Sequence, residues 1–172
     1  MGNVKALCLV AHPDDCVIFA YSYIHNHPNM TWHICYLTYC EWEPRARELK
    51  EFWSKRGITC IFLGYTDDYR DIENQKISFN EEQARREIGN IIQGYDLVLS
   101  HDQEGDYGHI HHEFVHDCVR HHPNLITFAK PGQGTTYTIP LGTYSLDELP
   151  MHRDIVAGFH PAEHKNSYKE PV

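Results

Sequence analysis

The chain has 172 residues, 41% of them hydrophobic, which predicts one compact domain over residues 1–172 with a sizeable buried core. Its formal net charge of −9 and its lack of a basic run argue against a surface that contacts nucleic acid. No stretch approaches the roughly 18 apolar residues of a membrane span, and the first residues lack a signal-peptide pattern. We therefore expect a soluble, cytoplasmic protein that binds no nucleic acid and has no membrane span.

The first part of the chain alternates short apolar stretches with amphipathic ones. The stretch KALCLVA is rich in strand-favouring residues and almost continuously apolar, which is typical of a buried strand. A later helix is closed by Gly57 and carries Lys and Arg in its last turn, as helix C-termini favour. The pattern predicts strand, helix, strand, helix and strand over residues 5–11, 16–27, 31–39, 43–57 and 59–64.

The second part continues the alternation after a polar stretch. Residues 65–79 show no clear period and predict a loop. Asn80, with Gln83 three residues later, is close to a capping box, and the isoleucines that follow fall on one helix face. The next expected elements are a strand, a loop, a helix and a strand over residues 96–100, 101–108, 109–122 and 125–129. Residues 130–172 predict turns, a hairpin, a short helix near residues 146–158 and a loose tail.

Alternation of strands and helices predicts an α/β fold, in which helices cover both faces of a mostly parallel sheet to give a three-layer sandwich. Sites in such sheets form outside the carboxyl ends of the strands. Two polar clusters obey this rule, because HPDD follows the first strand and SHDQEGDYGHIHH overlaps the end of the strand at residues 96–100. AHPDD has no glycine where a phosphate would need close backbone approach, so we expect no bound dinucleotide.

Both clusters contain residue types that bind metal ions. His12 and Asp15 lie three residues apart across a turn that Pro13 stiffens, and His109 and His112 lie three apart at a helix start. Each pair can aim two side chains at one point. Three nitrogen or oxygen ligands plus a water molecule are typical of catalytic zinc, whereas structural zinc prefers four protein ligands rich in cysteine. The adjacent Asp14 would then remain as a base.

The combination of AHPDD and DYGHIHH resembles the PIG-L/LmbE-like family of zinc-dependent N-acetylglucosaminyl deacetylases, whose signatures are A-H-P-D-D-E and G-H-P-D-H. The stretch EPRARELKEFWSKRGITCIFLGYTDD is similar to the helix, glycine turn, strand and acidic loop of the same family, so the resemblance covers roughly the first 120 residues. It implies a Rossmann-like fold and hydrolysis of an N-acetyl group on a small amino sugar or its glycoconjugate.

The resemblance also implies roles for individual residues. His12, Asp15 and His112 would bind zinc, or another divalent metal such as iron in its place. Asp14 would act as the general base, and His109 would stabilise the developing oxyanion. Either Asp14 or His109 would then protonate the leaving amine.

Three residues depart from the family signatures. Cys16 replaces a glutamate, Ile110 a proline, and His111 an aspartate that can hold the oxyanion histidine in its protonated form. Without that carboxylate we expect a lower pKa for His109 unless another carboxylate takes its place. The candidates for that substitution are Asp102, Asp106 and Glu113.

Weaker expectations concern the substrate. Arg45 could contact it, or form an ion pair with its helix neighbours, and Tyr107 could line the pocket or only pack. DIVAGFHPAEH faintly resembles the family helix that brings a histidine or tyrosine to the sugar cleft, which makes His160 a further substrate-binding candidate.

Three readings of the function stay open at this level. The first is a zinc-dependent N-deacetylase, which needs Asp14 and His109 as well as the metal ligands. The second is a catalytically silent module that binds zinc and a sugar and needs only the ligands. The third is a metal-free hydrolase with Cys16 as nucleophile beside His12, although the six cysteines include no C-x-x-C pair and read as reduced thiols. The oligomeric state is left open by the sequence.

Overall fold

The computed structural model describes residues 2–140, 142–159 and 164–171. These residues form a mixed α/β fold around a seven-stranded sheet in the order β3-β2-β1-β4-β5-β7-β6. The strands are β1 (Lys5–Val10), β2 (Thr31–Thr38), β3 (Thr59–Tyr65), β4 (Leu97–Ser100), β5 (Leu125–Ala129), β6 (Thr135–Ile139) and β7 (His164–Lys169). Strands β1 to β5 pair in parallel, whereas β7 runs antiparallel to both β5 and β6. The predicted mostly parallel α/β architecture is confirmed.

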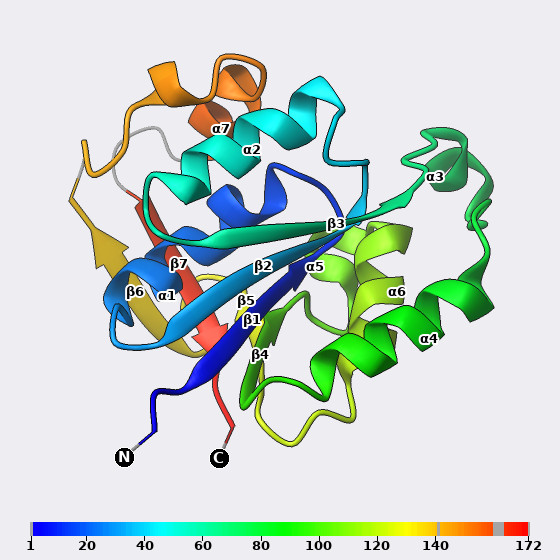
Figure 1. Cartoon of the computed structure of the whole chain (residues 1–172), viewed down its shortest axis with the longest axis horizontal. Coiled ribbons are helices and arrows are strands. Elements are labelled where there is room, and N and C mark those ends of the chain that lie inside the picture. The colour runs from blue at the N-terminus through cyan, green and yellow to red at the C-terminus, as the bar shows by residue number, and fades with distance from the viewer. Residues whose placement is uncertain (1, 141, 160–163, 172) are drawn as a thin grey trace.

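Helices cover both faces of the sheet (Figure 1). The helical segments are the π-helical turn η1 (Cys16–Ala20), α1 (Tyr21–Asn26), α2 (Pro44–Ser54), α3 (Arg70–Asn74), α4 (Glu81–Ile92), α5 (Gly105–Gly108), α6 (Ile110–Val119), the 3₁₀ turn η2 (Leu146–Glu148) and α7 (Arg153–Phe159). Helices α1 and α2 contribute to one hydrophobic core, and α4 and α6 contribute to the other. The sheet separates these two cores.

Strand β1 shows why its sequence is almost continuously apolar. Successive side chains of a strand point to opposite faces. Ala6, Cys8 and Val10 therefore belong to the core under α1 and α2, while Leu7 and Leu9 belong to the core under α4 and α6. All five are fully buried. A strand buried on both faces has no polar side to alternate with its apolar one.

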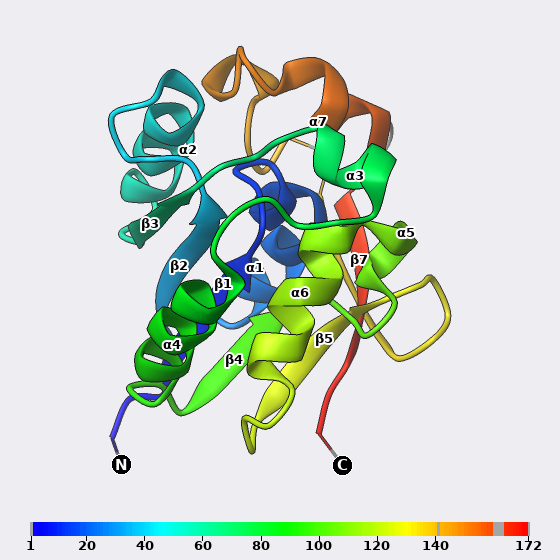
Figure 2. The ribbon, with the colours of Figure 1, turned by 90° about the vertical axis from the view of Figure 1, so that its right-hand side faces the viewer.

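The strand order reverses direction at β1, because β2 and β3 lie on one side of it and β4 and β5 on the other. In open parallel sheets the crevice beyond such a reversal is the usual position of a site. Here it lies outside the carboxyl ends of β1 and β4. Figure 2 shows the two ends of the chain at the opposite end of the sheet, where the parallel strands begin.

Most predicted elements form within a few residues of their expected bounds, and three local features differ. The helix expected over residues 16–27 begins as a π-helical turn. The expected loops at residues 65–79 and 101–108 contain the short helices α3 and α5, which are too brief to show a helical period in the sequence. The cap at Asn80 is confirmed, since its side chain accepts a hydrogen bond from the Gln83 backbone N–H at 3.1 Å.

The C-terminal segment is not the loose tail expected from its polar sequence. Residues of the expected tail form strand β7, which lies between β5 and β6. The expected hairpin is therefore a pairing of β6 with a strand distant in sequence. Tyr168 anchors β7, because its buried hydroxyl contacts Ser22 Oγ at 2.9 Å, the Tyr23 backbone N–H at 3.2 Å and the Phe19 carbonyl at 2.5 Å. This long-range contact leaves no periodic signal in the sequence.

The role of β7 can be tested with the variant Tyr168→Phe. Loss of the hydroxyl leaves the buried Tyr23 N–H without its acceptor, which should lower the free energy of unfolding by about 1–3 kcal/mol. Tyr137→Phe is the matched control, since its hydroxyl bonds the exposed Glu170, and we expect a change within about 0.5 kcal/mol. Denaturant unfolding measures both values. Equal values for the two variants would mean that β7 is not anchored in this way.

Candidate metal centre

The first half of the centre is the turn that follows β1. Asp15 Oδ2 accepts a hydrogen bond from the His12 backbone N–H at 2.8 Å, and the Asp15 N–H bonds the His12 carbonyl at 3.2 Å. These reciprocal bonds close the turn around Pro13 and fix the Asp15 carboxylate beside the His12 ring. The π-helical turn η1 starts immediately afterwards. Such turns are rare and often occur at functional sites.

The second half is the loop and helix start that follow β4. His109 caps α6, because its Nδ1 accepts a hydrogen bond from the His111 backbone N–H at 3.1 Å. Gly105 has a positive φ of 65°, and a Cβ there would lie 2.8 Å from Glu113 Cγ. Asp106 has a φ of 66° without being glycine, a strained conformation that commonly marks functional sites.

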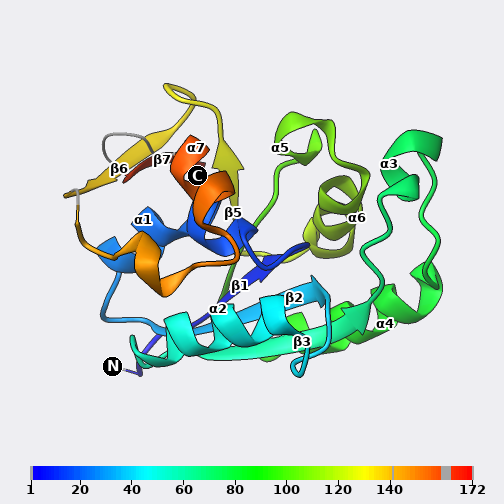
Figure 3. The same ribbon diagram turned by 90° about the horizontal axis from the view of Figure 1, so that it is seen from above.

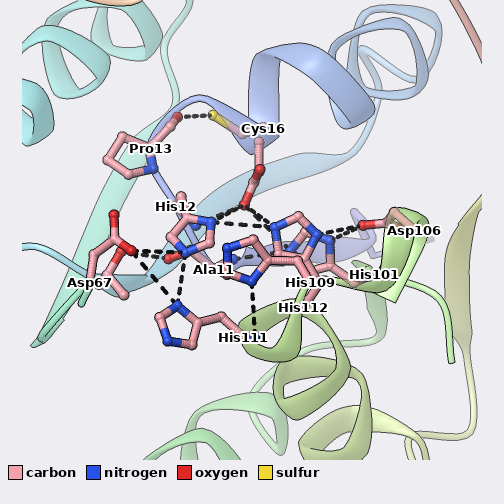
Figure 4. A network of polar contacts seen from close by, with 12 residues as sticks. Ala11, His12, Pro13, Cys16, Asp67, His101, Asp106, His109, His111 and His112 are labelled. Carbon is pink, nitrogen blue, oxygen red and sulfur yellow. Dashed lines mark hydrogen bonds and ion pairs between the residues drawn. The ribbon is translucent and has the colours of Figure 1, made fainter. Parts of the chain in front are cut away.

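Three of the predicted residues, His12, Asp15 and His112, converge between these two halves, and Figure 4 shows the rings of His12 and His112 side by side. Asp15 Oδ2 lies 3.3 Å from His12 Nδ1 and 3.2 Å from His112 Nε2, and the two nitrogens lie 3.3 Å apart. A tetrahedral zinc ion with bonds of about 2.0–2.1 Å separates its ligand atoms by about 3.3 Å. All three side chains are buried. The donor types and their spacing therefore fit a metal ion.

The electrostatics of this trio favour a positive charge. Burial lowers the pKa of His112, but the nearby carboxylates of Asp15 and Asp106 outweigh it and raise the pKa to about 10. For Asp15 the two effects have the opposite signs. Burial raises its pKa, but the imidazoles of His112 and His12 outweigh burial and bring the pKa well below the usual range. Two buried carboxylates around one imidazole thus attract a proton or a metal ion to this point.

Asp106 supports the trio from behind. Its Oδ2 lies 2.9 Å from His112 Nδ1 and also contacts His101 Nδ1. His112 Nε2 is therefore the ring nitrogen that faces Asp15 and His12. A carboxylate on the outer nitrogen of a ligating histidine is a common feature of metal sites. Asp106 is one of the three carboxylates that could have replaced the family's aspartate beside His109, but its Oδ2 contacts His112 and His101 instead.

His109 lies against the trio without a carboxylate of its own among the described residues. Its ring stacks on His112 with centroids 4.8 Å apart. Burial, followed by the imidazoles of His12, His112 and His111, lowers the pKa of His109 to about 3. Neither remaining candidate holds it protonated, because Asp102 bonds backbone N–H groups of its own loop and Glu113 is exposed. His109 thus has neighbours that lower its pKa and no hydrogen-bonded carboxylate among the described residues to raise it.

Asp14 differs from its neighbour Asp15 in environment. Its side chain is half-buried rather than fully buried. Burial and the adjacent charge of Asp15 raise the pKa of Asp14 to about 6. A carboxylate with such a pKa is well matched to proton transfer near neutral pH.

The structure also places the weaker candidates. Arg45 lies at the edge of the centre, where it donates to the Tyr39 hydroxyl at 3.3 Å, and Tyr39 in turn donates to Asp67. Tyr107 is 62% exposed, and its ring packs edge-on against His112 at 5.2 Å, so it borders the centre. His160 lies outside the described residues.

Cys16 does not fit the role of a nucleophile. It is fully buried, and its Sγ contacts the Pro13 carbonyl at 3.2 Å, the Tyr36 hydroxyl at 2.8 Å and Trp53 Nε1 at 3.0 Å. Burial raises the pKa of this thiol well above its ordinary value. A buried thiol with a raised pKa is inert. Cys16 therefore packs under the turn that carries His12 and takes no part in chemistry.

Two residues of the centre escaped the sequence analysis. Asp67 Oδ1 lies 3.4 Å from His12 Nε2, and Asp71 Oδ2 lies 2.7 Å from His111 Nε2. Both belong to the polar stretch over residues 65–79, which carries four acidic residues among fifteen. No pattern within that stretch distinguishes the two that turn inward.

The fold and the centre define an α/β protein with a buried cluster of histidines and aspartates at the carboxyl ends of its parallel strands. The PIG-L family, described as GlcNAc-PI de-N-acetylase, matches residues 7–122. The chain belongs to this family.

The described residues contain no helix with the length and apolar character of a membrane span.

Individual proteins resemble the chain more distantly. "Uncharacterized protein L374" of Acanthamoeba polyphaga mimivirus is 25% identical over 146 residues, which are 71% of this chain and 60% of that protein. The N,N'-diacetylchitobiose deacetylase of Pyrococcus horikoshii superimposes with a TM-score of 0.61 at 15% identity, covering 96% of this chain and 82% of the deacetylase. The 4-carboxy-2-hydroxymuconate hydratase GalB of Pseudomonas putida also gives 0.61 at 13% identity, covering 98% and 96%. At these identities the structural likeness shows the fold alone.

Alkylation tests the burial of Cys16. The thiol is fully buried, whereas Cys40 is only partly buried, so iodoacetamide should label Cys40 in the folded protein and Cys16 only after unfolding. Peptide mass spectrometry before and after denaturation measures both, with Cys40 as the internal control. Rapid labelling of Cys16 in the folded protein would restore the nucleophile hypothesis.

Proposed function

We propose that this chain is a metal-dependent hydrolase that removes an acetyl group from an N-acetylated amino sugar or its conjugate. The observation that carries the proposal is the convergence of His12, Asp15 and His112 within 3.2–3.3 Å of one another, next to Asp14, in a member of the PIG-L family. Two imidazoles and one carboxylate suit zinc, or another divalent ion such as iron.

A divalent ion held by these three residues would supply a Lewis acid that lowers the pKa of water toward neutrality. Asp14 is the residue that would accept the proton of the attacking water. Its pKa of about 6 leaves it mostly ionised at pH 7, and its partial exposure lets it reach a bound substrate. After accepting the proton, the Asp14 carboxyl can pass it to the leaving amine.

His109 is the group that stabilises the oxyanion. Its Nδ1 accepts the His111 backbone N–H, so the hydrogen of the neutral imidazole is on Nε2, which can donate to a negatively charged oxygen. The family resemblance implies a protonated imidazole in this role, whereas here burial and the surrounding imidazoles favour a neutral donor. Fixed donors of this kind contribute several kcal/mol, about 2.7–4 in measured cases, to the stabilisation of a transition state.

The substrate class follows from the relatives. The family description and the Pyrococcus deacetylase both name compounds of N-acetylglucosamine, and we propose the same class here, with Arg45 and Tyr107 at the edge of the site as substrate contacts. Because a hydratase shares the fold, release of acetate from N-acetylhexosamines and their conjugates is the decisive assay.

Metal content tests the ligand set. His12→Ala removes one of the three donors, and we expect stoichiometric zinc in the wild type, about one ion per chain, and none in the variant. His116→Ala is the control, since His116 lies on α6 and its ring bonds the His101 carbonyl outside the trio. Atomic emission on dialysed protein measures both. Full occupancy in His12→Ala would contradict the assignment.

The variant Asp14→Asn separates the base from the ligands. Removal of the base should lower kcat by about 10²-fold or more with little change in KM, while the metal content stays at the wild-type level. Asp15→Asn should lose metal affinity as well. Steady-state acetate release and metal analysis distinguish the two. Equal metal loss in both variants would mean that the roles of the carboxylates are exchanged, and unchanged kcat in Asp14→Asn would contradict the proposed mechanism.

A further inference from the structure

His111 stands where the family signature has an aspartate, and the structure gives it a different contact. Its ring is fully buried and lies between the metal centre and α3. His111 Nδ1 is 3.0 Å from His12 Nε2, and His111 Nε2 is 2.7 Å from Asp71 Oδ2. A continuous chain of two hydrogen bonds therefore runs from α3 to the outer nitrogen of His12.

One placement of the ring hydrogens satisfies both hydrogen bonds between His12, His111 and Asp71. His12 presents Nδ1 to Asp15 and His112, so its hydrogen must be on Nε2, where it is donated to His111 Nδ1. His111 then carries its own hydrogen on Nε2 and donates it to Asp71. Both imidazoles are neutral in this arrangement, and His12 Nδ1 keeps a free lone pair that points at the other two donors.

Asp71 is held ready to accept. It is only 2% exposed, and although burial raises its pKa, hydrogen bonds from His111 and Ser78 keep the pKa below the usual value. It comes from α3, which lies close to the N-terminal end of α6 in two perpendicular views (Figures 2 and 3). The other described acidic side chain of this helix, Glu73, is exposed.

We propose that His111 and Asp71 are positioning residues for His12, and that they set the affinity of the metal centre by fixing the orientation and hydrogen placement of its ring. This inference rests on the metal site proposed above and extends it to two residues that no signature motif assigns to it. The arrangement resembles the contact of Asp106 with His112, except that an imidazole lies between the carboxylate and His12. Asp67 Oδ1 also faces His12 Nε2, but at 3.4 Å it is farther away than His111 Nδ1 at 3.0 Å.

The physical effect is on affinity rather than on the number of ligands. Without His111 the described acceptor left to His12 Nε2 is Asp67 Oδ1 at 3.4 Å, which is longer than an ordinary hydrogen bond. The His12 ring can then rotate or take the other tautomer, in which Nδ1 carries the hydrogen and binds no metal. Loss of such a partner typically weakens metal affinity about 10–100-fold. Because Asp71 acts only through His111, its loss should matter only while His111 is present.

A double-mutant cycle tests this dependence. Asp71→Asn should raise the zinc dissociation constant about 10–100-fold, whereas Glu73→Gln, which removes an exposed carboxylate from the same helix, should leave it unchanged. His111→Leu should weaken binding as strongly, and His111→Asn should retain most of the affinity, since its amide oxygen can accept the His12 Nε2 hydrogen. In the His111→Asn background, Asp71→Asn should have no further effect.

Competition with a chelating dye measures the zinc affinities. The absorption spectrum of the cobalt-loaded protein provides a second readout, because it reports ligand geometry and is insensitive to global stability. We expect the spectrum of Asp71→Asn to shift and that of Glu73→Gln to match the wild type. Thermal unfolding identifies any variant that fails to fold, and the cycle then rests on His111→Asn.

The outcomes are distinct. If the wild type binds no metal, the proposed function fails. If the wild type binds zinc and Asp71→Asn binds it equally well with the same spectrum, the positioning role fails while the proposed function stands. If the wild type binds two ions and His111→Leu binds one, His111 is itself a ligand, as its proximity to His12 and His109 also permits, and the positioning role is overturned.

Discussion

The structure depends on the negative charge of Asp15, which is buried where two distant parts of the chain meet. A carboxylate in a protein interior costs several kcal/mol unless it is compensated. Here its Oδ2 accepts the His12 backbone N–H and lies within 3.2–3.6 Å of ring nitrogens of His12, His101 and His112. The turn after β1 and the residues after β4 are therefore held at one point, and the adjacent pairing of β1 with β4 is what allows them to meet.

Around Asp15, the histidine rings are held by further carboxylates. Asp106 contacts His112 and His101, and Asp71 contacts His111, which contacts His12. Each buried ring thus has a defined hydrogen placement, which a site must have before it can offer lone pairs in fixed directions. The strained backbone of Asp106 is tolerated because its side chain and backbone are fixed by several hydrogen bonds. Strain retained under such constraint is characteristic of a site rather than of an ordinary loop.

Two of the departures from the family signatures, Cys16 and His111, have different structural explanations. Cys16 replaces a glutamate in a position sealed by Tyr36 and Trp53, where a small apolar thiol packs well. The His111 side chain contacts His12 and Asp71 and lies beside the His109 ring, with centroids 5.0 Å apart. It offers His109 an imidazole where the family signature has a carboxylate. His109 would therefore offer the oxyanion of the proposed reaction a neutral N–H donor, because its Nδ1 accepts the His111 backbone N–H and imidazoles surround its ring. A neutral donor avoids placing another positive charge beside the cation-attracting trio.

The sequence by itself determined the α/β architecture and the positions of most strands and helices, because apolar periodicity and end signals are local properties. It also predicted that the polar clusters after the first strand and after residues 96–100 meet, since the carboxyl ends of parallel strands share one edge, and the family resemblance implied His12, Asp15 and His112 as the ligands there. It did not reveal the roles of Asp106, Asp71 or β7. Those depend on contacts between segments far apart in the chain, such as Asp71 with His111 and Tyr168 with Ser22. Only the tertiary structure decides which of many acidic or aromatic side chains turns inward, because burial depends on what packs against a residue and not on its neighbours in sequence.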